Sequence, residues 1–119
     1  MGKIRNPIRL PGKKSKYRAV RTQLDGLWFD SGAEAKKYAY LKQLEAIGEI
    51  KNLVADKAML KFSLWAGNEK TEVCHYEADF TYFIHGTFVV LDVKGFKTPE
   101  YRLKKKLFRA CYGFDITEA

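Results

Sequence analysis

The pattern of apolar and polar positions begins with a short hairpin followed by a helix. Residues 17–30 predict two strands joined at the dipeptide "DG", which is typical of tight β-turns. Residues 31–50 predict a helix of about four turns, with Ser31 as its N-cap and Gly48 as its stop signal.

The clearest strand pattern lies in residues 73–95, where β-branched and aromatic side chains stand on both sides of the dipeptide "HG". This pattern predicts two long strands that pair as a hairpin and turn at "HG". Residues 53–65 are strand-like but less regular, and residues 114–117 predict a final strand.

Residues 97–113 carry signals for a second helix at both ends. Thr98 is a suitable cap, Pro99 takes the first helical position, and Gly113 ends the helix. Its predicted buried stripe recurs at every fourth position and consists of Leu103, Leu107 and Cys111.

The predicted order of elements, ββ-α-βββ-α-β, indicates an α/β (α+β) fold with a mixed β-sheet flanked by two helices. A chain of 119 residues is long enough for one core. We expect residues 1–16 to be a flexible basic arm and residues 17–119 to form a single domain. Because 46% of the residues are apolar and 14% are aromatic, the disordered class is excluded.

The net charge of +8 is concentrated at the N-terminus. Residues 1–24 contain eight basic side chains and no acidic one, whereas the rest of the chain has 14 of each and is neutral. A basic arm of this kind favours polyanions, above all nucleic acid. A tail that only improves solubility is the alternative.

The two cysteines, Cys74 and Cys111, show no zinc-binding spacing, and we expect both to be reduced. No apolar run reaches the length of a membrane span, and the basic N-terminus lacks the apolar stretch of a signal peptide. We therefore expect a cytoplasmic protein with no membrane partner, in a bacterial or phage-infected host cell.

Asp92 and Lys94 interrupt the apolar run "VVLDVKG" two positions apart, so both point to the same face of a strand. A tight turn at "HG" would place Asp79 directly across from Asp92, and Glu77 across from Lys94. Two facing carboxylates repel each other unless a proton or a cation lies between them, and hard divalent ions take such oxygen ligands. In that arrangement Lys94 could orient a metal-bound water and stabilise charge on a phosphate. The alternative is a pair of surface charges on a solvent-facing strand.

Two further residues are candidates for the same site. Glu34 offers a third carboxylate, although Ser31-x-x-Glu34 also matches a capping box. His75 is expected on the same face as Asp79, and two roles are open for it: an accessory metal ligand or a structural histidine.

The combination of Glu34, the string "EADF" and the string "DVK", with twelve residues (80–91) between Asp79 and Asp92, resembles the PD-(D/E)xK nuclease superfamily. The longer strings "FDSGAEAKKYAYL" and "VVLDVKGFKTPEYRLKKKL" are similar to small phage-associated endonuclease-like proteins related to Holliday-junction resolvases and transposon-end endonucleases. The resemblance implies a restriction-endonuclease-like core of a helix, a three-stranded meander, a second helix and a final strand. Two departures are that Ala78 stands in place of the eponymous proline and that Asp92 is the shorter of the two permitted acids.

The resemblance also implies an activity and a set of catalytic residues. It implies that Asp79, Asp92 and Glu34 hold Mg²⁺, for which Mn²⁺ would substitute, and that Lys94 is the catalytic lysine. The expected enzyme is a homodimeric DNA endonuclease that acts on branched or phage DNA, for example in recombination, and leaves 5′-phosphate and 3′-hydroxyl ends. Two alternatives stay open: a DNA-binding module of the same fold without catalysis, and a nuclease subunit that needs a partner protein.

Candidate DNA-binding residues lie in the arm and in the second helix. They are Lys13, Lys14, Lys16, Arg18, Arg102, Lys104 and Lys105. A solvated helix face is the alternative for the residues of the second helix. Trp28 could stack on exposed bases, but core packing is its default expectation.

Overall fold

The computed structural model describes residues 20–67, 71–93 and 95–119 of the chain. It contains two helices, eight strands and one short 3₁₀-helix within these residues. In chain order they are β1 (Thr22–Leu24), β2 (Leu27–Phe29), α1 (Gly32–Ala46), β3 (Ile50–Val54), the 3₁₀-helix Lys57–Met59, β4 (Lys61–Ala66), β5 (Thr71–Glu77), β6 (Phe80–Ile84), β7 (Thr87–Asp92), α2 (Pro99–Tyr112) and β8 (Thr117–Glu118). The predicted arm, residues 1–16, lies outside the described residues.

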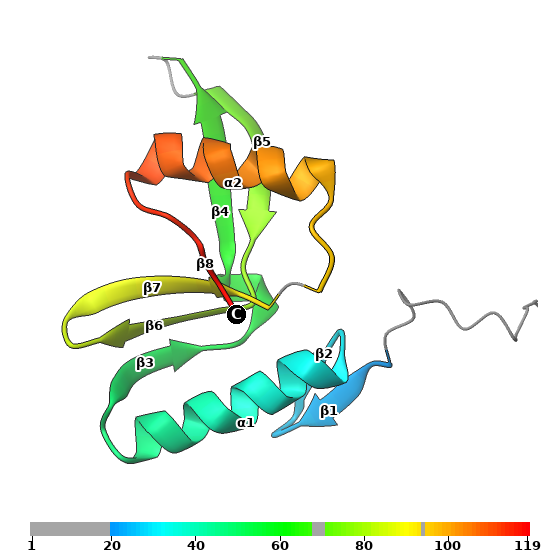
Figure 1. Ribbon diagram of the computed structural model, residues 1–119, viewed down its shortest axis with the longest axis vertical. Coiled ribbons are helices and arrows are strands. Elements are labelled where there is room, and N and C mark those ends of the chain that lie inside the picture. Colours follow the sequence, from blue (N-terminus) through cyan, green and yellow to red (C-terminus); the bar gives the residue numbers. More distant parts are fainter. Residues whose placement is uncertain (1–19, 68–70, 94) are drawn as a thin grey trace, which may run out of the picture.

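A four-stranded sheet of order β3-β6-β7-β8 forms the centre of the molecule. Its pairs are antiparallel except for β7 and β8, which are parallel, so the sheet is mixed. Figure 1 shows α1 and the β1–β2 hairpin on one side of this sheet, and α2 with the β4–β5 hairpin on the other. The predicted class, a mixed sheet flanked by two helices, is confirmed.

Two apolar clusters hold these layers together. One packs Phe29, Tyr38 and Leu41 against Phe80 and Leu91 of the sheet. The other gathers side chains of α2, the β4–β5 hairpin and the opposite side of the sheet, and consists of Leu60, Leu64, Tyr76, Ala78, Val90, Tyr101, Phe108 and Ile116. Because both faces of β7 are covered, its residues read as a nearly continuous apolar run.

The strand predicted upstream of "HG" is not one strand, and this expectation is wrong. It divides into β5, which pairs with β4, and β6, which pairs with β3 and β7. The backbone N–H of Ala78 donates to Leu60 O at 2.9 Å, and the next N–H, that of Asp79, donates to Leu91 O at 3.1 Å. The chain therefore changes hydrogen-bond partner between two consecutive residues, and the β4–β5 hairpin is an insertion into the predicted meander.

This division affects the predicted places of two residues. Glu77 and His75 lie in β5 and pair with Lys61 and Ser63 of β4, not with β7. The predicted placement of His75 on the face of Asp79 in one continuous strand is therefore wrong, whereas the predicted placement of Glu77 across from Lys94 cannot be compared with the described residues. Lys94 itself lies outside the described residues.

The turn and cap predictions are confirmed. The "DG" turn joins β1 to β2, and the β6–β7 hairpin has the predicted register, with Ile84 opposite Thr87. Thr98 Oγ1 accepts a hydrogen bond from the Tyr101 N–H, and Gly113 ends α2 in the left-handed conformation with φ of +83°. These features depend on neighbouring residues, which is why the sequence predicts them well.

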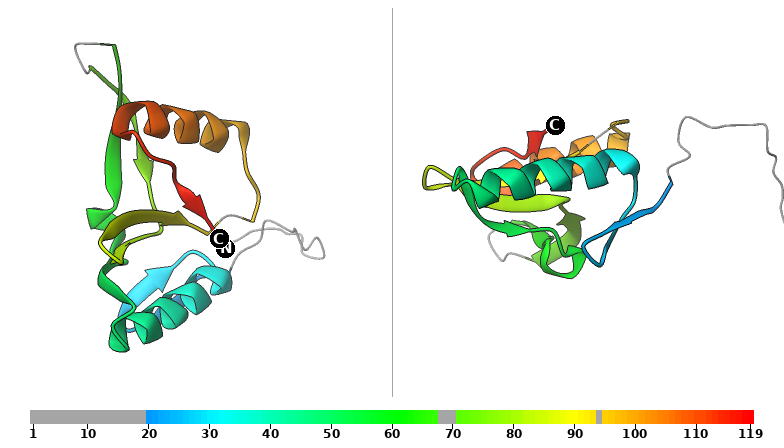
Figure 2. Two further views of the ribbon diagram at one scale, coloured as in Figure 1. Left: turned by 60° about the vertical axis from the view of Figure 1, so that its left-hand side comes forward. Right: turned by 90° about the horizontal axis from the view of Figure 1, so that it is seen from below.

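The predicted buried stripe of α2 is wrong. Leu103 is 66% exposed, and Leu107 and Cys111 are only partly buried, whereas Tyr101 and Phe108 fill the contact with the sheet. A step of four residues drifts away from a helix of 3.6 residues per turn, whereas a step of seven returns close to the same face. Figure 2 shows that β8 then returns from α2 to the sheet beside β7.

Among the described residues, no helix combines the length and the apolar character needed to cross a membrane.

Candidate functional site

Two of the predicted acids meet at one point although they lie far apart in the sequence. Glu34 belongs to the first turn of α1, and Asp79 occupies the bend between β5 and β6. The ammonium of Lys57 lies 3.3 Å from Glu34 Oε1 and 2.7 Å from Asp79 Oδ1. Both acidic residues are only 8% exposed. The cluster is therefore a half-enclosed cation site lined by carboxylate oxygens.

Asp79 is fixed by the end of β7 as well as by Lys57. Its backbone N–H donates to Leu91 O, and its Oδ2 accepts from the Val93 N–H at 2.7 Å. These two hydrogen bonds reach the residues on either side of Asp92. The backbone of Asp79 therefore lies next to that of Asp92, as predicted, although Asp79 itself precedes the first residue of β6.

Asp92 is the most deeply buried acid of the three. It is 2% exposed, and its Oδ2 accepts a hydrogen bond from the Tyr76 hydroxyl at 2.5 Å. Burial, followed by the bond to Asp92, raises the pKa of Tyr76 well above its usual range, so this hydroxyl stays a donor. Tyr76 belongs to β5, so the inserted hairpin supplies the group that orients Asp92.

Ser31 caps α1 as predicted, whereas the Glu34 side chain takes part in the site. The backbone N–H of Glu34 donates to Ser31 Oγ at 3.2 Å, while its carboxylate turns to Lys57. Burial first, and then the negative charge of Asp79, raises the pKa of Glu34. Burial lowers the pKa of Lys57, but its bonds to Asp79 and Glu34 outweigh that effect and raise it overall. Lys57 is therefore an ammonium at neutral pH.

The donor chemistry of the site fits a hard cation. Glu34 and Asp79 offer oxygens of the kind that Mg²⁺ takes, and they already share a positive group. Across 20–67, 71–93 and 95–119, no three His, Cys, Asp or Glu side chains form a ready metal cluster. The predicted set of Glu34, Asp79 and Asp92 therefore includes two acids joined through Lys57 and a third held by Tyr76.

One protein-family profile matches the sequence, over residues 14–116, and its description reads "Protein of unknown function (DUF1064)". The chain belongs to the DUF1064 family. A search of curated proteins and a search of solved structures each found no match. The DUF1064 region includes every residue of the cluster as well as Lys94.

A basic pocket of about 670 Å³ lies between α2 and the C-terminal strand of this DUF1064 chain. It is lined by Lys97, Tyr101, Arg102, Lys105, Lys106, Arg109, Asp115 and Glu118. Lys97 and Lys105 pair with Glu118, and Lys104, a predicted DNA contact, pairs with Glu100. Arg102 and Lys106 form no ion pair with any residue in the described ranges.

Glu118 links the last strand of the DUF1064 chain to α2 through its contacts with Tyr101 and Lys105. A hydrogen bond from the Tyr101 hydroxyl at 2.7 Å, followed by one from Lys105, lowers the pKa of Glu118 to about 2. The stabilisation from this contact is therefore complete above the usual carboxyl pKa and is lost as the pH falls towards 2.

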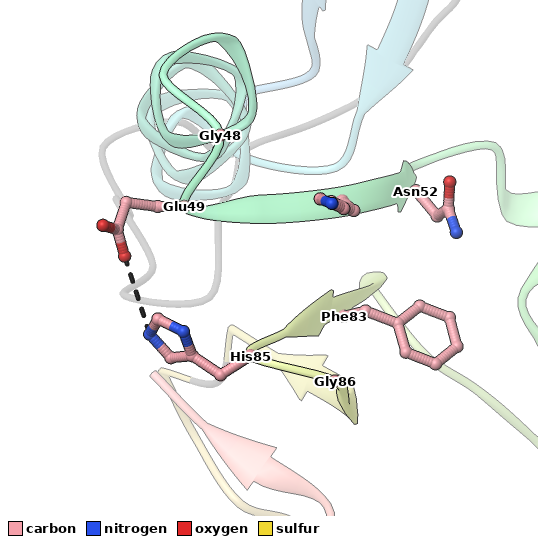
Figure 3. A pocket seen from close by; sticks show the side chains of 7 residues that line it. Gly48, Glu49, Asn52, Phe83, His85 and Gly86 are labelled. Atoms are coloured by element: carbon pink, nitrogen blue, oxygen red, sulfur yellow. Dashed lines mark ion pairs between the residues drawn. The ribbon is translucent and has the colours of Figure 1, made fainter.

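A second pocket, of about 440 Å³, lies at the far end of the sheet from the acids. Figure 3 shows it between the start of β3 and the β6–β7 turn, with His85 Nε2 3.7 Å from Glu49 Oε1. β6 separates this pocket from Asp79, and a five-residue strand spans roughly 16 Å. The pocket is therefore not part of the acidic site, and His85 is the turn residue that its sequence context indicates.

Four residues of this DUF1064 chain have contacts or exposure that the sequence did not predict. Lys57 and Tyr76 lie in segments with an ordinary strand pattern, and nothing in that pattern indicates contacts to distant acids. The Asp56 carboxylate caps the 3₁₀-helix by accepting from the Ala58 N–H, and "DKA" could have indicated a turn there. The default expectation of core packing for Trp28 is wrong, since it is half-exposed beneath the Arg21 guanidinium, 4.8 Å from its ring.

Removing the charge of Glu34 tests the electrostatics of the DUF1064 site. Because the folded state raises the pKa of Glu34, its stabilising contribution is present below about pH 4.5 and is lost as the pH rises. We expect Glu34→Gln to unfold at the same or a higher temperature than the wild type at pH 7, with a smaller difference at about pH 4. Thermal unfolding at both pH values is the measurement, and Glu49→Gln, an exposed site, is the control. A clear loss of melting temperature at pH 7 would show that the bond to Lys57 outweighs the burial.

Proposed function

We propose that the chain is a Mg²⁺-dependent DNA endonuclease of the PD-(D/E)xK superfamily. One observation supports this most strongly. Glu34 and Asp79, which lie in separate segments, both bind the ammonium of Lys57, and Asp79 also bonds to the end of β7 beside Asp92. These are the acids that the resemblance assigns to the metal. A structural ion pair does not require a third buried acid at the same strand end.

In this proposal Asp79, Asp92 and Glu34 would hold the metal ion. When bound, Mg²⁺ would activate a water and stabilise negative charge on the phosphodiester. The protein supplies the orientation: the Val93 N–H holds Asp79, and the Tyr76 hydroxyl holds Asp92. Lys94, two residues beyond Asp92 in the sequence, is assigned to position the attacking water or to stabilise the phosphate.

The DNA backbone is proposed to lie along α2 and the basic arm. Arg102 and Lys106 stand one helical turn apart, line the basic pocket and have no acidic partner within the described part of the chain. Lys105 lines the same pocket, and the arm residues Lys13, Lys14, Lys16 and Arg18 lie outside the described ranges.

Removing two cations from α2 is expected to weaken DNA binding in a salt-dependent way. Each phosphate contact contributes about 0.9 to the slope of log affinity against log salt. The double variant Arg102→Ala/Lys106→Ala should therefore lower that slope by about 2 on duplex DNA. Fluorescence anisotropy over a salt series measures it, and Lys42→Ala/Lys51→Ala, away from α2, is the charge-matched control. Equal slopes for the two double variants would remove α2 from the DNA-binding surface.

A cleavage assay tests the proposed activity. Four-way junction, flap and linear DNA are incubated with Mg²⁺ or Mn²⁺, and the wild type is compared with Asp92→Asn and Lys94→Ala. We expect the wild type to cut a branched substrate, leaving 5′-phosphate ends, and both variants to fail. Binding without cutting of any substrate would favour the inactive DNA-binding module, and cutting only with an added partner protein would favour a nuclease subunit. Cleavage that survives in both variants would refute the site assignment, and a parallel RNA series tests the substrate class.

A homodimer is part of the proposal, because resolving a junction requires two cuts. We place the activity in the cytoplasm of a bacterial or phage-infected host cell, where phage and recombining DNA is processed. Light scattering of the full chain with and without junction DNA measures the stoichiometry, and one monomer per junction would contradict the dimer.

A further inference from the structure

Lys57 occupies the position in the acidic site that the proposed metal needs. It lies in the 3₁₀-helix Lys57–Met59, directly after the capping residue Asp56. Its ammonium is 2.7 Å from Asp79 Oδ1 and 3.3 Å from Glu34 Oε1, and its side chain is 27% exposed. Lys57 is therefore bound on its inner side by two carboxylates and has solvent on its outer side.

The two oxygens of Asp79 are already divided between two partners. Oδ2 accepts from the Val93 N–H at 2.7 Å, and Oδ1 accepts from Lys57 at 2.7 Å. The Val93 bond is part of the backbone framework that joins the β5–β6 bend to β7, so it cannot be released without moving that framework. Oδ1, which is held by a movable side chain and not by the backbone, is therefore the more open of the two Asp79 oxygens to an incoming cation.

A divalent ion and an ammonium cannot share these oxygens at no cost. Both would lie within a few Å of each other in a site that is partly removed from water, where like charges repel strongly. Lys57 has a long, flexible side chain with a path to solvent, so it is the group that can move. Glu34 and Asp79 are held by the helix start and by the strand end, respectively.

We propose that Lys57 is an exchangeable counter-ion of this site: its ammonium holds Asp79 Oδ1 and Glu34 Oε1 until a divalent cation binds and displaces it. The inference rests on the proposed function, since it takes the acids to be metal ligands. Lys57 is then a positioning residue. It keeps the two acids together in the metal-free protein and sets how tightly the metal binds.

The first test measures metal affinity, not activity. Lys57→Met keeps most of the length of the side chain and removes its charge. We expect this variant to bind Mn²⁺ at least about tenfold more tightly than the wild type in calorimetry, because a charge-assisted bond no longer competes. Mn²⁺ should also raise the melting temperature of this variant more than that of the wild type. Lys57→Arg keeps a cation and should not gain affinity, and Lys61→Met, on the neighbouring strand β4, is the matched control.

The second test uses the wild-type chain, so it does not depend on how the variant folds. Reductive methylation followed by mass spectrometry reports how accessible each lysine is. We expect the methylation rate of Lys57 to rise several-fold with saturating Mg²⁺, whereas that of Lys61 stays constant.

The possible outcomes separate this inference from the proposed function. Equal or weaker Mn²⁺ binding by Lys57→Met, or an unchanged methylation rate in a wild type that binds metal, overturns the exchange and leaves the metal site standing. Failure of both the wild type and Lys57→Met to bind Mn²⁺ overturns the metal site and the exchange together.

Discussion

Asp79→Asn is expected to lower Mg²⁺-dependent DNA cleavage at least about 100-fold and to leave the fold intact. An asparagine can still accept the Val93 N–H with its one carbonyl oxygen. Its amide then stands in place of Oδ1, the oxygen that holds a cation in the present arrangement. Single-turnover cleavage of a four-way junction, with circular dichroism of the same samples, measures both quantities.

The matched control for this substitution is Asp25→Asn in the β1–β2 turn. Asp25 accepts a hydrogen bond from the Tyr38 hydroxyl, which an asparagine can also accept, and its positive φ of 55° suits asparagine. This variant should cleave at the wild-type rate. If Asp79→Asn also retained that rate, Asp79 would not be a metal ligand and the proposed mechanism would fail.

Phe108→Ala is expected to reduce the free energy of unfolding by about 3–5 kcal/mol, the largest effect on stability that we predict. Phe108 is fully buried, and its ring lies 4.7 Å from that of Tyr112, 5.3 Å from Phe114 and 5.4 Å from Phe62, between ring centroids. A truncation there leaves a cavity between α2 and the β4–β5 hairpin. Urea unfolding monitored by fluorescence measures the change.

Leu103→Ala, in the same helix, is the control for that measurement. Because Leu103 is largely exposed, its truncation should change the free energy of unfolding by no more than about 0.5 kcal/mol. If Leu103→Ala lost more free energy of unfolding than Phe108→Ala, α2 would pack through the face of Leu103, Leu107 and Cys111, contrary to the structure.

The sequence predicts those parts of the fold that depend on adjacent residues. The "DG" and "HG" turns, the caps Ser31 and Thr98, and the end of α2 at Gly113 are set by local backbone chemistry. The register of the β6–β7 hairpin follows from its turn, and it brings the backbone of Asp79 next to Asp92 as predicted.

Features that depend on distant partners could not be predicted in the same way. Glu77, Ala78 and Asp79 are weak strand formers, but strong strand formers stand on both sides of them, and the break is set by hydrogen bonds to Leu60 and Leu91. For the same reason Lys57 gave no signal: its role depends on Glu34 and Asp79, which lie 23 and 22 positions away in the sequence. The sequence thus indicated Glu34, Asp79 and Asp92 as candidates, but it did not predict the Lys57 cation between Glu34 and Asp79.

A crystal structure of the chain with Mn²⁺, with anomalous scattering recorded, tests the central claim most directly. The account predicts an anomalous peak about 2–2.5 Å from Asp79 Oδ1, with Asp92 or Glu34 as a further ligand and the Lys57 ammonium moved away. At a Mn²⁺ concentration that saturates binding in solution, a peak bound only elsewhere, with Lys57 still on Asp79, would contradict it.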